Sequence, residues 1–296
     1  MADATRPSAR SVARRAEALG ARLPALMVAA ERVAATVAQG VHGRRRVGHG
    51  DSFWQFRPFV AGDSIARIDW RQSAKSERTF VRETEWEAAQ TIGLWRDGSA
   101  SMRWRSRAMP VDKRERASLL LLALASLLLR GGERVLPMRQ GARAGAGRGA
   151  LDRLAETLEG PSDAAEADKL PPPLPLPRHA RVVLVGDFLS PLDEVQASIA
   201  RLAAIPVTGH LMQVLDPAEV MLPYLGRVRF RSPGGSDDVL IPRVESVRAE
   251  YGRKLAAHQA GLADICAAAG FGFGTHRTDH PPEAALLALY AALDRR

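Results

Sequence analysis

From residue 91 onward, short strand-like runs alternate with helix-like runs, and this alternation constrains the fold more than any other feature. The strand-like runs are short and apolar, and they are predicted at residues 91–95, 134–138, 180–185, 207–214 and 271–275. Helices are predicted between and after them, at residues 113–130, 151–158, 192–204, 245–269 and 282–293. Strands separated by helices pair in parallel through right-handed crossovers. The sequence therefore predicts an α/β protein with a doubly wound, mostly parallel sheet.

The chain divides into three parts. Residues 1–42 have the pattern of a helical arm, residues 43–89 that of a small β-rich segment that contains tryptophan, and residues 90–296 that of the α/β domain. Within the α/β domain, five prolines predict an extended linker at residues 170–178 that crosses the surface, with a PxxP-type ligand as the lesser alternative. A hairpin is predicted at residues 226–243 around two glycines.

The arm is amphipathic. Its apolar residues recur every three or four positions, which places them on one face of a helix or of two helices bent at a proline: Val12, Ala16, Leu19, Leu23, Met27, Ala30, Val33 and Val37. Because this face is rich in small alanine and valine side chains, we expect it to dock on the body of the protein. A membrane surface or a partner helix is the alternative.

The net charge of +9 invites a nucleic-acid hypothesis, because basic surfaces attract polyanions. The excess is concentrated in the first fifty residues, which include the run Arg44, Arg45 and Arg46. Almost all of the positive residues along the chain are arginine, and the chain is also rich in alanine. This pattern is typical of a bias in genomic base composition. We therefore expect a solvated basic face, and nucleic-acid binding through the arm stays the lesser alternative.

Cysteine content and hydropathy bear on the compartment. The single cysteine, Cys266, excludes an internal disulfide and cysteine-based zinc sites. The longest uncharged apolar run, at residues 117–129, is 13 residues long, whereas a spanning helix needs about 20. We expect a cytoplasmic protein with no membrane span.

The sharpest chemical signal follows the first strand of the predicted sheet. There the sequence places Asp97, Ser99 and Ser101 in one loop, and Asp187 follows a later strand in the same way. Ligands of open α/β sheets bind beyond the carboxyl ends of the strands, and two such strands can be neighbours. Carboxylate and hydroxyl oxygens are hard donors that suit Mg²⁺ or Mn²⁺. The alternative is a loop whose side chains only cap the next helix.

This Asp-x-Ser-x-Ser loop with a later strand-end aspartate resembles the metal-ion-dependent adhesion site of von Willebrand factor A domains. The resemblance implies that Ser99 and Ser101 bind the metal directly, that Asp97 and Asp187 support it through water, and that a partner carboxylate takes the open position. The family also uses a loop threonine. The loop at residues 141–150 contains neither serine nor threonine, so the implied metal site lacks one ligand.

A second resemblance covers residues 43 to about 105 densely and returns at residues 182–188. It is carried by Gly43 to Arg46, Phe53 to Arg57, Gly62-Asp63, Arg67 to Arg71, Val81 to Glu83 and the Asp97 to Met102 loop. The order and spacing are similar to the bacterial family known as domain of unknown function fifty-eight. Members of that family are encoded beside MoxR-type AAA+ ATPases. The resemblance therefore implies such an ATPase as partner, together with other von Willebrand-like or membrane proteins of the same system.

A separate prediction concerns the charged residues of the segment at residues 43–89. The charges alternate in sign around a tryptophan, which favours a network of partly buried ion pairs that locks the segment in place, with direct partner contact as the alternative. The residues singled out are Arg57, Asp63, Arg67, Asp69, Trp70, Arg71 and Lys75.

Three classes of function remain open. The leading hypothesis is a non-enzymatic interaction module, and the third is nucleic-acid binding through the basic arm. The second is a Mg²⁺-dependent phosphoryl hydrolase that uses Asp97 and Asp187, as in haloacid-dehalogenase-like phosphatases. Those enzymes need a second aspartate two residues after the first, where this chain has Ser99. No P-loop, Gly-x-Ser-x-Gly elbow or zincin helix motif occurs in the sequence.

Overall fold

The structure is a computed structural model, and it describes residues 26–38, 53–60, 65, 68–76, 78–84, 89–160, 169–231 and 238–293. Two compact units are present. One comprises the described residues between 42 and 89, and the other comprises the rest. In the part of the chain that the structure describes, no helix is both long and apolar enough to cross a membrane.

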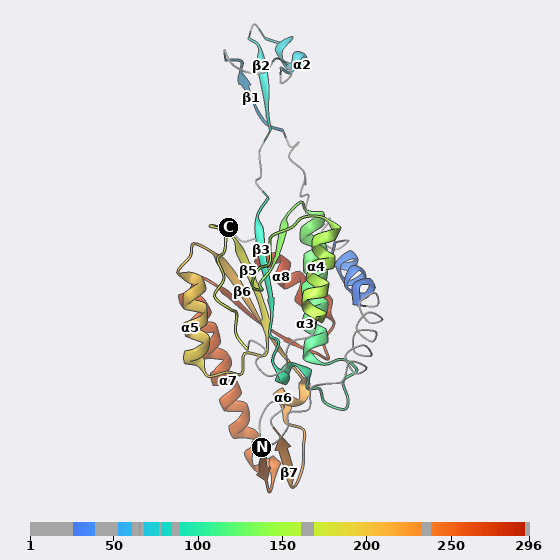
Figure 1. Cartoon of the computed structure of the whole chain (residues 1–296), viewed down its shortest axis with the longest axis vertical. Coiled ribbons are helices and arrows are strands. Elements are labelled where there is room, and N and C mark those ends of the chain that lie inside the picture. Colours follow the sequence, from blue (N-terminus) through green and yellow to red (C-terminus); the bar gives the residue numbers. More distant parts are fainter. Residues whose placement is uncertain are drawn as a thin grey trace, which may run out of the picture. The chain divides into compact units, whose positions relative to one another are not determined.

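The larger unit is built on five parallel strands (Figure 1): β3 (Thr91–Arg96), β4 (Arg134–Pro137), β5 (Arg181–Gly186), β6 (Thr208–Leu215) and β9 (Gly272–Arg277). Their order across the sheet is β4-β3-β5-β6-β9. The chain therefore winds outward from β3 to β4 and then crosses back to add β5 on the other side of β3. The predicted α/β class with a mostly parallel sheet is confirmed.

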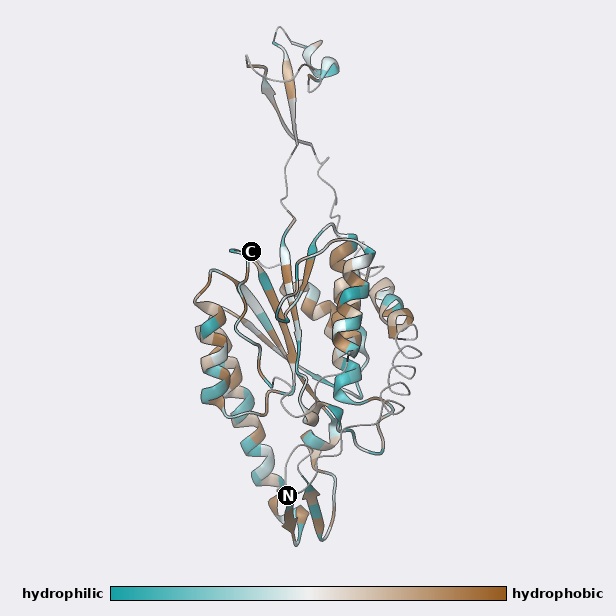
Figure 2. Ribbon diagram, in the orientation of Figure 1, coloured by the Kyte–Doolittle hydropathy of each residue, from teal (hydrophilic) through white to brown (hydrophobic). Residues whose placement is uncertain are grey.

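Helices cover both faces of the sheet. One face carries α3 (Lys113–Arg130), α4 (Arg148–Glu159), α8 (Pro282–Ala292) and the helical residues 26–38, and the other carries α5 (Leu192–Ala203) and α7 (Val244–Ala268). Helix α3 is buried on nearly all sides, as its leucine- and alanine-rich sequence requires. By contrast, α5 alternates hydrophilic and hydrophobic residues and buries one face (Figure 2).

The described part of the N-terminal arm packs against the body. Residues 26–38 are helical, and Ala30, Val33, Ala34 and Val37 join the core cluster formed by α3, α4 and α8. Small side chains let this helix approach closely, which is the docking that the sequence pattern predicts. The earlier positions of the arm and the run Arg44 to Arg46 lie outside the described residues.

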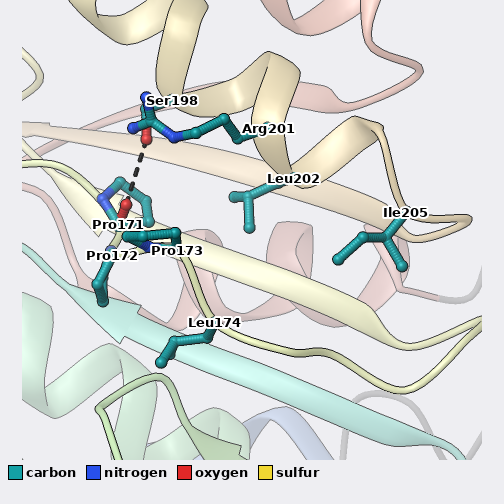
Figure 3. Close-up of a pocket in the computed structure, with 8 residues that line it drawn as sticks. All are labelled: Pro171, Pro172, Pro173, Leu174, Ser198, Arg201, Leu202 and Ile205. Carbon is teal, nitrogen blue, oxygen red and sulfur yellow. Dashed lines mark hydrogen bonds between the residues drawn. The ribbon is translucent and has the colours of Figure 1, made fainter.

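The proline-rich segment packs on the body along part of its length. Pro171 and Leu176 are buried, and Ser198 of α5 donates a hydrogen bond from its hydroxyl to the Pro171 carbonyl over 3.3 Å. A shallow cavity of about 280 Å³ lies between this segment and α5 (Figure 3). Residues 171–177 form neither helix nor strand, and Leu176 contributes its side chain to the core on the α5 and α7 face of the sheet.

The remaining elements lie at the carboxyl end of the sheet or in the smaller unit. A 3₁₀ turn, η2 (Ala100–Arg103), follows β3, and α6 (Pro217–Met221) follows β6 and leads into the hairpin β7 (Val228–Arg231) and β8 (Asp238–Ile241). The smaller unit contains the antiparallel pair β1 (Phe53–Pro58) and β2 (Phe80–Thr84) and a short helix, α2 (Trp70–Ser73).

A buried histidine makes the larger unit sensitive to acid. The ring of His276 in β9 accepts a hydrogen bond at Nε2 from the Arg116 guanidinium over 3.1 Å. Burial, reinforced by the charge of Arg116, lowers the pKa of His276 from 6.5 to about 4. The neutral ring is thus favoured in the folded state, so stability is fully present above pH 6.5 and is lost as the pH falls toward 4.

We expect this group to cost about 2 kcal/mol of unfolding free energy between about pH 7 and pH 5. Urea denaturation at the two pH values, on the wild type and on His276→Gln, measures it. The glutamine variant should lose less stability over this interval than the wild type. Equal losses in the two proteins would show that His276 does not carry the effect.

Candidate functional site

The candidate site begins where β3 ends. The Asp97 amide donates to the Val185 carbonyl over 2.9 Å, which extends the pairing of β3 with β5 by one residue. The Asp97 side chain is thereby turned into the gap between the two strand ends, where it is 1% exposed. Its Oδ1 accepts a hydrogen bond from the Ser99 amide over 2.7 Å. This contact folds the loop back on itself and fixes the directions of the serine side chains.

The two serines link the loop to the next strand. The hydroxyls of Ser99 and Ser101 are 2.9 Å apart, and the Ser101 hydroxyl donates to Asp187 Oδ2 over 2.6 Å. Asp187 follows β5, the direct neighbour of β3. All four residues that the sequence singled out are therefore brought together, and they meet at the carboxyl ends of adjacent strands.

The backbone beyond Asp187 holds that side chain in place. Phe188 has a positive φ of 47°, which is uncommon for a residue with a side chain, and its ring packs on Trp95 with centroids 5.9 Å apart. A hydrogen bond of 2.7 Å joins His258 Nε2 to the Phe188 carbonyl, and Gln213 donates its side-chain amide to the Asp187 carbonyl over 2.9 Å. The turn after β5 is thus fixed from α7 and from β6.

A lysine that the sequence analysis did not assign to the site lies beside it. Lys113, the first residue of α3, is fully buried, and its Nζ contacts Asp187 Oδ2 at 3.0 Å and Glu219 Oε1 at 2.5 Å. Glu219 belongs to α6, which follows β6. A single ammonium group therefore joins α3 to the loops after β5 and β6.

The end of β6 supplies a further buried carboxylate. Asp216 is completely buried, and its two oxygens accept the amides of Ala218 over 2.8 Å and Ser106 over 2.9 Å. The Asp216 amide in turn donates to Glu219 Oε2 over 2.8 Å, which completes a capping box at the start of α6. Ser106 lies in the loop after η2. The loops after β3 and β6 are thus tied directly to each other.

Both Lys113 and Asp216 left a signal in the sequence. Asp216 lies two residues beyond the end of a predicted strand, as Asp97 and Asp187 do, and it precedes Pro217 with Glu219 three residues on, which is the pattern of a helix start. Lys113 is one of four lysines and begins the most apolar predicted helix. A search for every acid at a strand end would have found Asp216.

Burial and charge shape the protonation of the cluster. Burial, together with the negative charge of Asp187, raises the pKa of Asp97 from 3.8 to about 6. Burial likewise raises the pKa of Glu219. Burial alone would lower the pKa of Lys113, but the charges of Asp187 and Glu219 outweigh it and raise that pKa. The ammonium form of Lys113 is thus favoured.

Carboxylate and hydroxyl oxygens, which are the donors that a hard divalent cation accepts, meet at this point. The hydroxyl oxygens of Ser99 and Ser101 are 2.9 Å apart and share a hydrogen bond. In the described part of the chain, no group of three or more histidine, cysteine, aspartate or glutamate residues is placed to hold a metal ion. An ion here would therefore rest on Ser99, Ser101, Asp97 and Asp187, with water completing its shell.

The predicted ion-pair network around Trp70 stays a prediction, because several of its residues lie outside the described part of the chain. The Trp70 side chain is 66% exposed, and Asp69 accepts the Gln72 amide over 2.9 Å as the N-cap of α2. Among the described residues of this unit, Asp69, Arg71 and Lys75 form no ion pair with one another. Asp63, Arg67 and the Arg57 side chain lie outside the described residues.

Comparison with known proteins gives a family. The family model described as "Protein of unknown function DUF58" matches residues 55–261. Uncharacterized proteins of Mycobacterium tuberculosis and Mycobacterium bovis are 25% identical over 249 residues, which is 78% of this chain and 76% of each relative.

Two solved structures are similar in part. One is the conserved hypothetical protein BatB from Bacteroides thetaiotaomicron, with a TM-score of 0.36 and 12% identity over 70% of this chain and 98% of that one. The other is an aerotolerance-related membrane protein from Bacteroides fragilis, with a TM-score of 0.35 and 12% identity over 71% of this chain and 100% of that one.

Proposed function

The chain belongs to the DUF58 family, and from that membership we propose that it is a non-catalytic protein-interaction module of the von Willebrand factor A type. The partner that we propose is a MoxR-type AAA+ ATPase, which the family resemblance implies and which the module would meet in the cytoplasm. The binding face is the carboxyl end of the sheet. An acidic side chain of the partner would be held there beside the hydroxyls of Ser99 and Ser101.

The position of the cluster is the main support for this proposal. The strand order places β3 and β5 on either side of the point where the winding of the sheet reverses. In doubly wound sheets, ligands bind at this switch point, because the loops after the two strands turn away in opposite directions and leave a crevice. Asp97, Ser99, Ser101 and Asp187 occupy these two loops. Ser101 is partly exposed, whereas Asp97 and Ser99 are buried.

A divalent ion at this site would be held by the two serine hydroxyls, with Asp97 and Asp187 supporting it through water. When bound, the ion supplies an open coordination position for a partner carboxylate. The chain's own residues orient that position. The hydrogen bond from the Ser99 amide to Asp97 fixes the conformation of the loop after β3. The hydrogen bond from Ser101 to Asp187 fixes the distance of this loop from the end of β5.

The test is capture of the ATPase from a lysate of the native host on the tagged full-length chain, with identification by mass spectrometry. Ser101→Ala removes the one hydroxyl that bridges the two loops and is partly exposed. We expect about tenfold less ATPase on this variant than on the wild type in Mg²⁺, since a lost charge-assisted contact is worth about 1.5 kcal/mol or more. The matched control is Thr157→Ala on α4, whose hydroxyl donates only to the Arg153 carbonyl.

Each outcome decides between hypotheses. Capture that is equal on Ser101→Ala and on the wild type would refute the proposed binding face. Loss of capture in a chelator would show that the partner is held through an ion. Hydrolysis of p-nitrophenyl phosphate in Mg²⁺ that Asp97→Asn abolishes would favour the phosphoryl hydrolase instead. We expect no turnover, because Asp97 is 1% exposed and one of its oxygens already accepts the Ser99 amide.

A further inference from the structure

The buried ammonium group of Lys113 is an unusual feature for the interior of an α/β protein. Lysine is almost never fully buried unless it is paired, because removal of a charge from water costs several kcal/mol. Here the side chain is 0% exposed. Its Nζ lies 3.0 Å from Asp187 and 2.5 Å from Glu219, and both are charge-assisted contacts.

The surroundings of this ammonium group are strongly acidic. Asp187 is 4% exposed and Asp97 is 1% exposed, and the Glu219 side chain is 18% exposed. Two carboxylates thus contact one ammonium group, and a third carboxylate, that of Asp97, is buried in the same cluster. Without that positive charge, the loops after β3, β5 and β6 would bring like charges together in a site that excludes most water, which is strongly unfavourable.

The helix that carries Glu219, one partner of Lys113, is joined in turn to α7. Glu219 is held in α6, and the backbone carbonyl of Glu219 accepts the Tyr251 hydroxyl of α7 over 2.6 Å. Arg248 of α7 donates to the carbonyls of Leu222 and Tyr224, just after α6. The ammonium group therefore sits at the centre of a series of contacts that joins α3, β5, α6 and α7.

We propose that Lys113 is the resident cation of this site. Its ammonium group assembles the loops with no divalent ion bound, and a divalent ion adds on the side of Ser99 and Ser101 as a ligand-binding element only. This inference deepens the proposed function, on which its relevance to partner binding rests. According to this inference, the binding face assembles independently of metal binding. The face should therefore be folded at any metal concentration.

Thermal unfolding of the full-length chain, in a chelator and in excess Mg²⁺, tests the proposal. The wild type should stay folded in the chelator, and Mg²⁺ should raise its melting temperature only by the increment that ion binding to the folded state supplies, which is smaller than the loss caused by removal of the Lys113 charge. Lys113→Met keeps the length of the side chain and removes the charge. In the chelator we expect it to melt about 10 °C or more below the wild type, because a buried carboxylate pair is left uncompensated. Mg²⁺ should restore at least half of this loss, since a divalent ion replaces the missing charge.

Two further variants keep the test decisive. If Lys113→Met does not fold, Lys113→Met with Glu219→Gln removes one charge of each sign and should fold with a higher melting temperature than the single variant. The matched control is Lys254→Met, because Lys254 pairs with Glu250 at the surface and its side chain is 77% exposed. It should melt as the wild type does in both conditions.

Two results would overturn the proposal. A wild type that loses as much stability in the chelator as Lys113→Met does would show that a divalent ion assembles the loops. A Lys113→Met variant that melts as the wild type does in the chelator would show that Lys113 serves packing alone. Neither result depends on capture of the ATPase, so this inference and the proposed function can fail separately.

Discussion

Replacement of Gly186 by alanine is expected to lower the free energy of unfolding by about 3 kcal/mol and to open the candidate site. Gly186 is the last residue of β5. A Cβ atom added there would lie 2.7 Å from the Cβ of Asp97 and 3.3 Å from the Phe188 ring. The Asp97 Cβ cannot move away, because the Asp97 amide donates a hydrogen bond to the carbonyl of Val185, which precedes Gly186 in β5. The methyl group can be accommodated only if β3 and β5 separate.

Urea denaturation measures the change, and a second glycine supplies the control. Gly252 lies within α7, and a Cβ atom added there meets nothing within 4 Å. Gly252→Ala should therefore raise the unfolding free energy by about 0.5–1 kcal/mol, because alanine loses less backbone entropy in a helix. A Gly186→Ala protein as stable as the wild type would mean that the strand ends are less tightly joined than the contacts around Asp97 imply.

The elements of the larger unit could be predicted from the sequence because their signals are local. Helix α3 and strands β3 and β5 are long or strongly apolar runs, and the structure places them within a residue or two of the predicted bounds. The short elements η2 and α6 were missed. A capping box starts α6, whereas η2 has no side-chain cap, and both helices are too short to show a periodic pattern.

The site could be predicted in part for the same reason. Asp97, Ser99 and Ser101 are close in sequence, and parallel pairing brings Asp187 to them. Lys113 could not be assigned in this way, because a lysine at the start of a helix is normally solvated. Only the packing of α3 against the loops after β5 and β6 buries it. In the smaller unit, Asp69 caps α2, and the ion pairs that the alternating charges predict stay a prediction.

Asp216→Ala is expected to be as damaging as the glycine substitution, although Asp216 was not among the predicted site residues. The side chain is 0% exposed and accepts the amides of Ala218 and Ser106. Hydrogen bonds to a charged group are worth about 1.5–3 kcal/mol each, so we expect a loss of about 4 kcal/mol. Alanine would leave these two amides without a partner, whereas the backbone amide at position 216 could still donate to Glu219, whose other oxygen contacts Lys113.

The comparison variant for this prediction is Asp112→Ala. Asp112 caps α3 by accepting the Glu115 amide over 2.7 Å, and it is partly exposed. Its replacement should cost only about 1 kcal/mol, because water can satisfy the freed amide. Urea denaturation of both variants gives the difference directly. If the two losses were equal, Asp216 would be an ordinary cap of α6, and the loop after β3 would be held by Asp97 and Asp187 alone. A threefold or larger difference would make the ends of β3, β5 and β6 one cooperative unit, in which the binding face cannot form at one strand without the other two.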